Sequence, residues 1–286
     1  VGGQGDGARR PPPARRRSRG RAMRSVHMKW VRAPFLALAL AGCATTEEVP
    51  DPSYIPSDKA AINTQLGVEY MKTGNYDTAI VKLKKALEDD PNYSSAYSML
   101  GEVYRRTGQM DKAEEFFRKA VDLDPKDSGA WSNYGQYLCQ VGRYAEADTM
   151  FEKALANPLY PTPEIALTNQ GVCAARQGEL GRAEEKLRAA LDRNPNVPAA
   201  LLEMGEVTYR QGQYLKARGY LARYAEVAKH SPRSLWLGVR VERQLGDADA
   251  VGSYSVALKG RFPESAETRL LMGSERRGGH GETVGQ

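Results

Sequence analysis

The chain has 286 residues and holds 41 Lys and Arg against 35 Asp and Glu, which gives a formal net charge of +6. Residues 1–42 contain ten of the basic residues and one of the acidic ones, so residues 43–286 hold 31 basic and 34 acidic residues and a net charge of −3. This balance disfavours nucleic-acid binding, which requires a clustered basic face.

Residues 1–27 are rich in Gly, Pro and Arg and show no apolar periodicity. We interpret them as an over-extended start that precedes a true start at Met28; a long basic leader beginning at Val1 or Met23 is the alternative. Residues 28–42 have the layout of a cleaved secretory leader, with a short basic segment before the apolar run from Ala33 to Ala41. That run is too short to span a bilayer, which needs ~20 apolar residues.

The leader ends in Leu40-Ala41-Gly42-Cys43, a segment that resembles the lipobox of bacterial lipoproteins. The resemblance implies that Cys43 is lipidated and begins the mature chain outside the cytoplasm. Bacterial lipoproteins with Asp directly after this Cys tend to stay in the inner membrane, and here Ala44 follows. We therefore expect a lipid anchor on the periplasmic face of the outer membrane. Residues 43–58 combine this Cys with a segment rich in Pro, Thr and acid, which predicts a flexible tether.

A repeat of about 34 residues fills residues 59–271, because three positions recur at intervals of 34, 34, 36, 34 and 33 residues. The glycine position holds Gly67, Gly101, Gly135, Gly171, Gly205 and Gly238. The alanine position holds Ala79, Ala113, Ala147, Ala183, Ala217 and Ala250, and a large apolar position follows each alanine by four residues. The interval of 36 places a two-residue insertion within residues 155–160.

Each unit has the pattern of a helical hairpin. In the second unit, Leu100, Gly101 and Tyr104 share one face of a first helix, and Ala113 and Phe117 share one face of a second. Gly101 and Ala113 are expected where the helices cross, since a larger side chain would cost about 1–3 kcal/mol by overpacking. The pattern resembles the tetratricopeptide repeat. The resemblance implies an all-α, right-handed superhelix of about six hairpins, the last one degenerate, with a concave groove.

Two cysteines, Cys139 and Cys173, lie within this array. Equivalent positions on neighbouring first helices would be roughly 8–10 Å apart, too far for a disulfide, which needs a Cα separation of about 5.5 Å. The two cysteines are offset by two residues relative to their motif glycines, so one can face forward and the other back. Together with an oxidising compartment, this offset favours a disulfide. Two buried thiols are the alternative.

Asn133 and Asn169 each lie two residues before a motif glycine, on the first helices that line the groove. An Asn side chain both donates and accepts hydrogen bonds, so it can pair with the backbone of an extended peptide. Other tetratricopeptide proteins use Asn here in that way. A solvated Asn, or one that caps a repeat, is the alternative at each position.

No constellation of catalytic residues accompanies the repeats. His230 has no cysteine or acid at metal-ligand spacing, and no phosphate-binding GxxxxGK[ST] segment occurs. We therefore expect no enzyme activity, metal, cofactor or small-molecule substrate. Residues 272–286 are rich in Gly and Arg and are expected to form a disordered tail.

Several segments together resemble the PilF/PilW family of type IV pilus biogenesis lipoproteins. They are residues 133–135, 138–139, 142–147, 169–174, 212–214, 217–218, 235–243 and 262–265. The resemblance implies a pilotin, an outer-membrane lipoprotein that carries the pilus secretin to the outer membrane and promotes its multimerisation.

Two other functions belong to different classes. One is a general periplasmic scaffold lipoprotein for outer-membrane protein assembly or cell-wall enzymes. A generic scaffold needs neither the cysteine pair nor the segment Leu235-Trp236-Leu237-Gly238, so both features disfavour it. The other is a regulatory subunit of an enzyme, which a co-purifying catalytic chain would reveal.

Overall fold

The computed structural model describes residues 57–279, and the side chains of residues 57–276. The described residues form helices and contain no strand. The helices are α1 (Asp58–Lys72), α2 (Tyr76–Asp89), α3 (Ser94–Arg106), α4 (Met110–Leu123), α5 (Ser128–Gln140), α6 (Tyr144–Ala156), α7 (Pro163–Gln177), α8 (Leu180–Arg193), α9 (Pro198–Arg210), α10 (Tyr214–Val227), α11 (Pro232–Leu245), α12 (Ala248–Arg261) and α13 (Ala266–Gly279).

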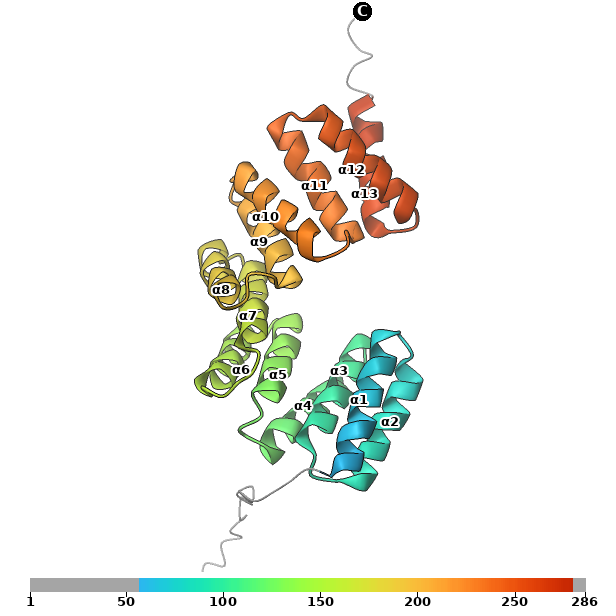
Figure 1. Cartoon of the computed structure of the whole chain (residues 1–286), viewed down its shortest axis with the longest axis vertical. Coiled ribbons are helices and arrows are strands. Elements are labelled where there is room, and N and C mark those ends of the chain that lie inside the picture. The colour runs from blue at the N-terminus through green and yellow to red at the C-terminus, as the bar shows by residue number, and fades with distance from the viewer. Residues whose placement is uncertain (1–56, 280–286) are drawn as a thin grey trace, which may run out of the picture. The chain divides into compact units, whose positions relative to one another are not determined.

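The first twelve helices pair in chain order into hairpins, α1 with α2 through to α11 with α12 (Figure 1). Each first helix also contacts the first helix of the next repeat, from α1 with α3 to α9 with α11. The predicted all-α array of paired tetratricopeptide hairpins is therefore confirmed.

The motif glycines lie where the two helices of a hairpin approach each other most closely. A Cβ atom at Gly101 would lie 2.8 Å from Phe117 Cδ1, and one at Gly135 would lie 2.7 Å from Phe151 Cε1. Real side chains almost never come so near, so these positions are restricted to Gly. The repeat spacing thus reflects a steric requirement, although at Gly205 the nearest atom is Cδ2 of Leu237 in the next repeat, 3.0 Å from a Cβ atom placed there.

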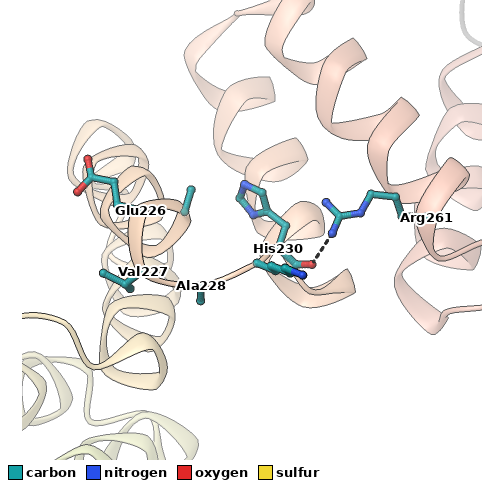
Figure 2. Close-up of a pocket in the computed structure, with 7 residues that line it drawn as sticks. Glu226, Val227, Ala228, His230 and Arg261 are labelled. Carbon is teal, nitrogen blue, oxygen red and sulfur yellow. Dashed lines mark hydrogen bonds between the residues drawn. The ribbon is translucent and has the colours of Figure 1, made fainter.

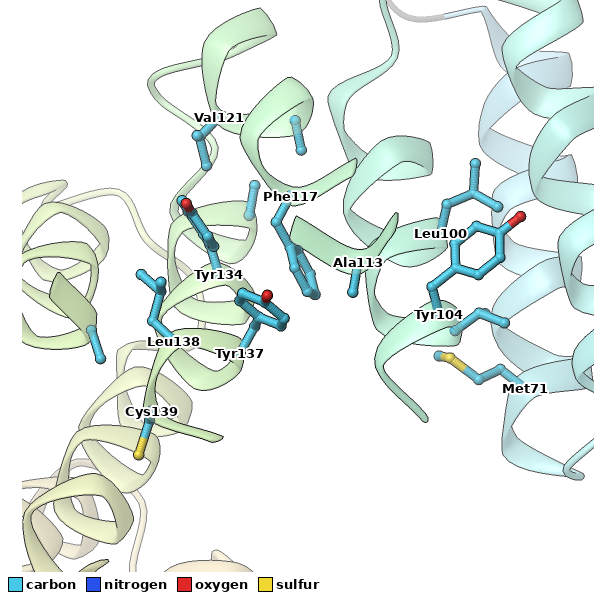
Figure 3. Packing of buried hydrophobic residues seen from close by; sticks show 14 of the residues in the cluster. Met71, Leu100, Tyr104, Ala113, Phe117, Val121, Tyr134, Tyr137, Leu138 and Cys139 are labelled. Carbon is cyan, nitrogen blue, oxygen red and sulfur yellow. The ribbon is translucent and has the colours of Figure 1, made fainter. Parts of the chain in front are cut away.

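The core of the early repeats is rich in aromatic side chains (Figure 3). Phe117 is fully buried, and its ring centroid lies 6.1 Å from that of Tyr134 and 5.6 Å from that of Tyr137. These separations are typical of favourable aromatic pairs. Since Phe117 comes from α4 and the two tyrosines from α5, this cluster joins the second repeat to the third.

The two-residue insertion lies in the connection between α6 and α7, which has six residues where the connection between α4 and α5 has four. Asn157 stabilises it: its Nδ2 donates to Ser128 Oγ over 3.2 Å, and its Oδ1 accepts from the backbone N–H of Leu159 over 3.0 Å. The longer loop leaves Leu159 85% exposed.

The predicted boundary at Leu271 is wrong, because α13 continues to Gly279. This helix packs on α11 and α12 and buries Leu271 completely. Lys259 forms an ion pair with Glu275 at 2.8 Å, and Arg243 donates to Ser274 Oγ over 2.9 Å. These contacts support helix in a segment that composition alone assigned to a tail; residues 280–286 lie outside the described part.

Candidate functional site

The first helices of repeats two to four are joined by matching hydrogen bonds. Asn133 Nδ2 on α5 donates to Ser98 Oγ on α3 over 3.0 Å, and Asn169 Nδ2 on α7 donates to Ser132 Oγ on α5 over 3.4 Å. Each Ser lies three residues before its motif glycine and each Asn two residues before its own. The two bonds therefore repeat one geometry along the groove-side helices.

These two hydrogen bonds determine which atoms of Asn133 and Asn169 remain available to bind a ligand. Both side chains are only partly buried, and one amide donor of each is already used between repeats. Within the described residues neither Oδ1 atom accepts a hydrogen bond, so each carbonyl could accept from a peptide N–H. The sequence analysis did not predict these hydrogen bonds between repeats. A peptide-binding role for the two Asn residues stays a prediction.

Cys139 and Cys173 form a disulfide between α5 and α7, with their Cα atoms 5.7 Å apart. Both are almost fully buried, at 4% and 3% exposed. The bond closes a sequence separation of 34 residues, two fewer than the interval of 36 between Gly135 and Gly171. The disulfide and the bond from Asn169 to Ser132 thus join the same two helices, which fixes the third repeat against the fourth.

The predicted lipidation site, Cys43, lies outside the described residues. Among the helices of residues 57–279, none is long and apolar enough to cross a membrane.

A polar cluster that the sequence did not reveal centres on Glu114 of α4. Its carboxylate accepts hydrogen bonds from Arg143 over 2.6 Å and from Arg118 over 2.8 Å. The hydroxyls of Tyr134 and Tyr137 also donate to it, each over 3.3 Å. The cluster joins α4, α5 and the start of α6, so it fixes the second repeat against the third.

This environment shifts the pKa values of Glu114 and Tyr137. Burial acts to raise the pKa of Glu114, but hydrogen bonds from Arg143 and Arg118 outweigh it and hold the pKa below its ordinary value. Burial and the neighbouring Glu114 carboxylate raise the pKa of Tyr137 to about 12. Glu114 is therefore ionised and Tyr137 neutral at physiological pH, which suits a fixed structural link better than proton transfer.

The first helices of the last two repeats are joined by ion pairs. Arg233 on α11 pairs with Glu203 on α9 at 2.5 Å, and Arg240 on α11 pairs with Glu206 on α9. The Arg240 guanidinium also lies over the Tyr209 ring, 4.7 Å from its centroid. These contacts replace the Ser–Asn bonds found between earlier repeats.

His230 lies in the connection between α10 and α11, beside a shallow pocket that Arg261 also lines (Figure 2). Its ring packs against Tyr224 and Tyr254, and Arg261 donates to its backbone carbonyl over 3.5 Å. Burial and the nearby Arg261 charge lower the pKa of His230. Within residues 57–279 no group of three or more His, Cys, Asp or Glu side chains could hold a metal ion.

Known proteins share this array. The tetratricopeptide repeat family matches residues 70–132 and 174–235, and two further forms of the repeat match residues 135–198 and 116–149. The type IV pilus assembly protein PilF of Pseudomonas aeruginosa is 32% identical over 237 residues, which are 81% of this chain and 93% of PilF.

Two solved structures resemble this one over three quarters of the chain. That of PilW, described as a widely conserved type IV pilus biogenesis factor, is 36% identical, with a TM-score of 0.66 over 76% of this chain and 99% of PilW. That of PilF from Pseudomonas aeruginosa is 31% identical, with a TM-score of 0.63 over 76% of this chain and 97% of PilF.

Proposed function

Since the chain belongs to the PilF/PilW family of type IV pilus assembly proteins, we propose that it is the pilotin of a pilus secretin. In this proposal the protein is an outer-membrane lipoprotein facing the periplasm. It binds the secretin subunit, brings it to the outer membrane and promotes its multimerisation. It acts by binding and performs no chemistry.

The observation that carries the proposal is the extent of the family match. The alignment with PilF covers 93% of that protein, and the structural match with PilW covers 99% of that chain. A general scaffold would share the repeat without sharing 32–36% identity over 93–99% of the length of PilF and PilW.

The first repeat offers a surface for the secretin. Ile62, Leu66 and Tyr70 form a stripe on α1 and are 58%, 40% and 36% exposed. In the second repeat the equivalent positions, Ala96 and Leu100, are fully buried, because the preceding hairpin covers them. A large apolar stripe that no hairpin of the described array covers is typical of a protein interaction site.

A lipid anchor at Cys43 would explain how binding at this surface promotes secretin multimerisation. Secretin subunits cross the periplasm before they assemble, and unpaired strand edges on such subunits are prone to mispairing. A lipid anchor at Cys43 would hold bound subunits at one membrane. Tethering of this kind raises local concentration to about the mM range for short linkers, which favours multimerisation over mispairing.

The stripe can be tested with a matched pair of variants. Leu66→Glu places a charge within the stripe, whereas Val81→Glu places the same charge at an isolated apolar residue of α2 that is 64% exposed. We expect the first variant to lose co-purification with the secretin and the second to retain it. Retention by both variants would contradict the stripe as the contact surface.

The anchor is tested by cell fractionation of strains producing Cys43→Ser or Ala44→Asp. The first variant removes the lipid, and the second keeps it but carries the signal for the inner membrane. We expect outer-membrane secretin multimer to be lost in both strains, and multimer to collect in the inner membrane only with Ala44→Asp. Normal outer-membrane multimer with Cys43→Ser would refute the anchored mechanism.

A further inference from the structure

A row of cations follows the first helices of the array, five residues after each motif glycine. The position holds Lys72, Arg106, Gln140, Arg176, Arg210 and Arg243. All but one of these residues are basic, although residues 43–286 carry a net negative charge overall. The row therefore concentrates positive charge along one line of the surface.

The two halves of this row differ in how its cations are paired. Lys72 pairs with Glu69 of its own helix at 2.7 Å, and Arg106 pairs with Glu102 at 2.6 Å. Arg176, Arg210 and Arg243 are exposed, and none of them pairs with a carboxylate within the described residues. The free positive charge thus lies in the fourth, fifth and sixth repeats.

Contacts between neighbouring repeats make these three arginines part of one surface. Arg210 Nη1 donates to the backbone carbonyl of Ala175, the residue before Arg176, over 2.7 Å. The Arg243 guanidinium lies 5.9 Å from the centroid of the Trp236 ring. Trp236 also contacts the Arg240 guanidinium, which in turn lies over Tyr209, the neighbour of Arg210. These contacts therefore connect α7 to α9 and α9 to α11 beside the three arginines.

The carboxylates nearest to these arginines along the chain are already paired. Glu206 pairs with Arg240, Glu242 pairs with Arg218, and Glu179 pairs with Arg182 at 3.2 Å. Acids of the same repeats are thus committed to other arginines. Within the described residues, no carboxylate is therefore paired with Arg176, Arg210 or Arg243, and all three can receive acids of a ligand.

We propose that Arg176, Arg210 and Arg243 bind an extended acidic segment of a partner protein. Neighbouring packed helices are about 8–10 Å apart, and an extended peptide rises about 3.3 Å per residue. Three peptide residues therefore span one repeat, so the matching segment carries Asp or Glu at every third position. Trp236, partly exposed beside Arg243, supplies an apolar contact for a residue between them.

The arrangement fits a peptide better than a membrane surface. Binding to anionic lipid uses compact clusters of about four to eight basic residues, whereas this row presents one free arginine per repeat in a line. A linear row at the spacing of the repeat matches a linear ligand. This inference holds whether or not the secretin is the partner of the first repeat.

The test measures binding of the purified protein to a labelled peptide with three Glu at every third position. A peptide of the same composition with its Glu residues adjacent is the comparison. Each exposed charge pair contributes a factor of about 1.4 to 5. We therefore expect Arg176→Gln/Arg210→Gln/Arg243→Gln to weaken binding by about threefold to a hundredfold, and the peptide with adjacent Glu to bind severalfold more weakly.

The matched control is Arg193→Gln/Arg223→Gln/Arg269→Gln, which removes three exposed arginines that also lack a carboxylate partner within the described residues. It should leave peptide affinity within about twofold of the parent. Arg176 is exposed and forms no hydrogen bond or ion pair within the described residues, so Arg176→Gln alone should weaken binding while leaving the urea unfolding curve unchanged. Equal weakening in both triple variants, equal affinity for both peptides, or binding to anionic vesicles without binding to the peptide would each overturn the proposal.

Discussion

Helices α3–α6 and helices α9–α12 build the same hairpin pair from different side chains. The first pair buries the rings of Phe117, Tyr134, Tyr137 and Phe151 and is joined to the fourth repeat by a disulfide. The second pair buries mainly aliphatic side chains and is joined across its first helices by ion pairs. The repeat therefore requires small residues at the crossing and sufficient apolar volume, while the links between repeats can be aromatic, covalent or ionic.

The largest effect should come from the aromatic core of the early repeats. Phe117→Ala should lower the free energy of unfolding by about 3–5 kcal/mol, because it removes a fully buried ring and leaves a cavity. Urea unfolding followed by circular dichroism measures it. Phe116→Ala is the control: this neighbour on α4 is partly exposed, so its loss should be clearly smaller. Equal losses would contradict Phe117 as the centre of the core.

The disulfide should contribute the next largest effect. Removing it with Cys139→Ala/Cys173→Ala should lower the free energy of unfolding by about 2–4 kcal/mol, since it closes a sequence separation of 34 residues. Reduction of the parent protein should give nearly the same loss. Mass spectrometry of unreduced peptides from periplasmic protein first establishes whether the bond forms. We expect the peptides that contain Cys139 and Cys173 to be linked by a disulfide. Two free thiols would show that these repeats are joined without the bond.

Glu114→Gln should lower the free energy of unfolding by about 1–3 kcal/mol at pH 7, because the charged acceptor of the hydrogen bonds from Arg143 and Arg118 is lost. The folded pKa of Glu114 is lowered, so its stabilising contribution is present above the ordinary value of 4.5 and declines as the pH falls through the folded value. Unfolding at pH 7 and pH 3 tests this. Glu115→Gln, on the exposed side of α4, should show neither the loss nor its pH dependence.

The smallest effect should come from the ion pairs of the late repeats. Glu203→Gln should lower the free energy of unfolding by about 0.2–1 kcal/mol, because the side chain of its partner Arg233 is 46% exposed and solvent screens its charge. The difference should vanish in 1 M salt, where the Debye length is about 3 Å. A loss that persists in high salt would mean that this pair resembles the buried links of the early repeats.

The repeat and its crossing residues could be predicted from the sequence because each depends on a local, recurring constraint. Gly101 must be small whatever lies beyond its hairpin, since Phe117 of the same hairpin fills the space. The disulfide could be predicted for a related reason, because the register of Cys139 and Cys173 follows from the repeat.

Links between particular residues of different repeats could not be predicted in this way. The Glu114 cluster joins residues up to 29 positions apart, and no periodic signal marks which of many acids meets which arginine. The arginine row also could not be predicted from the net charge of residues 43–286. Net charge sums over all residues, whereas the fold places basic and acidic residues on different faces. Helix α13 was missed because its Gly and Arg content outweighed the apolar residues that dock it.

The pilotin proposal is tested most directly by deleting the gene and resolving heat-stable secretin multimer from monomer on a gel. The parent gene and the Leu66→Glu variant are then returned on a plasmid. We expect the deletion to lose multimer while keeping secretin monomer, the parent gene to restore multimer, and the variant to fail. Multimer at the parental level in the outer membrane of the deletion strain, with pili intact, would contradict the proposal.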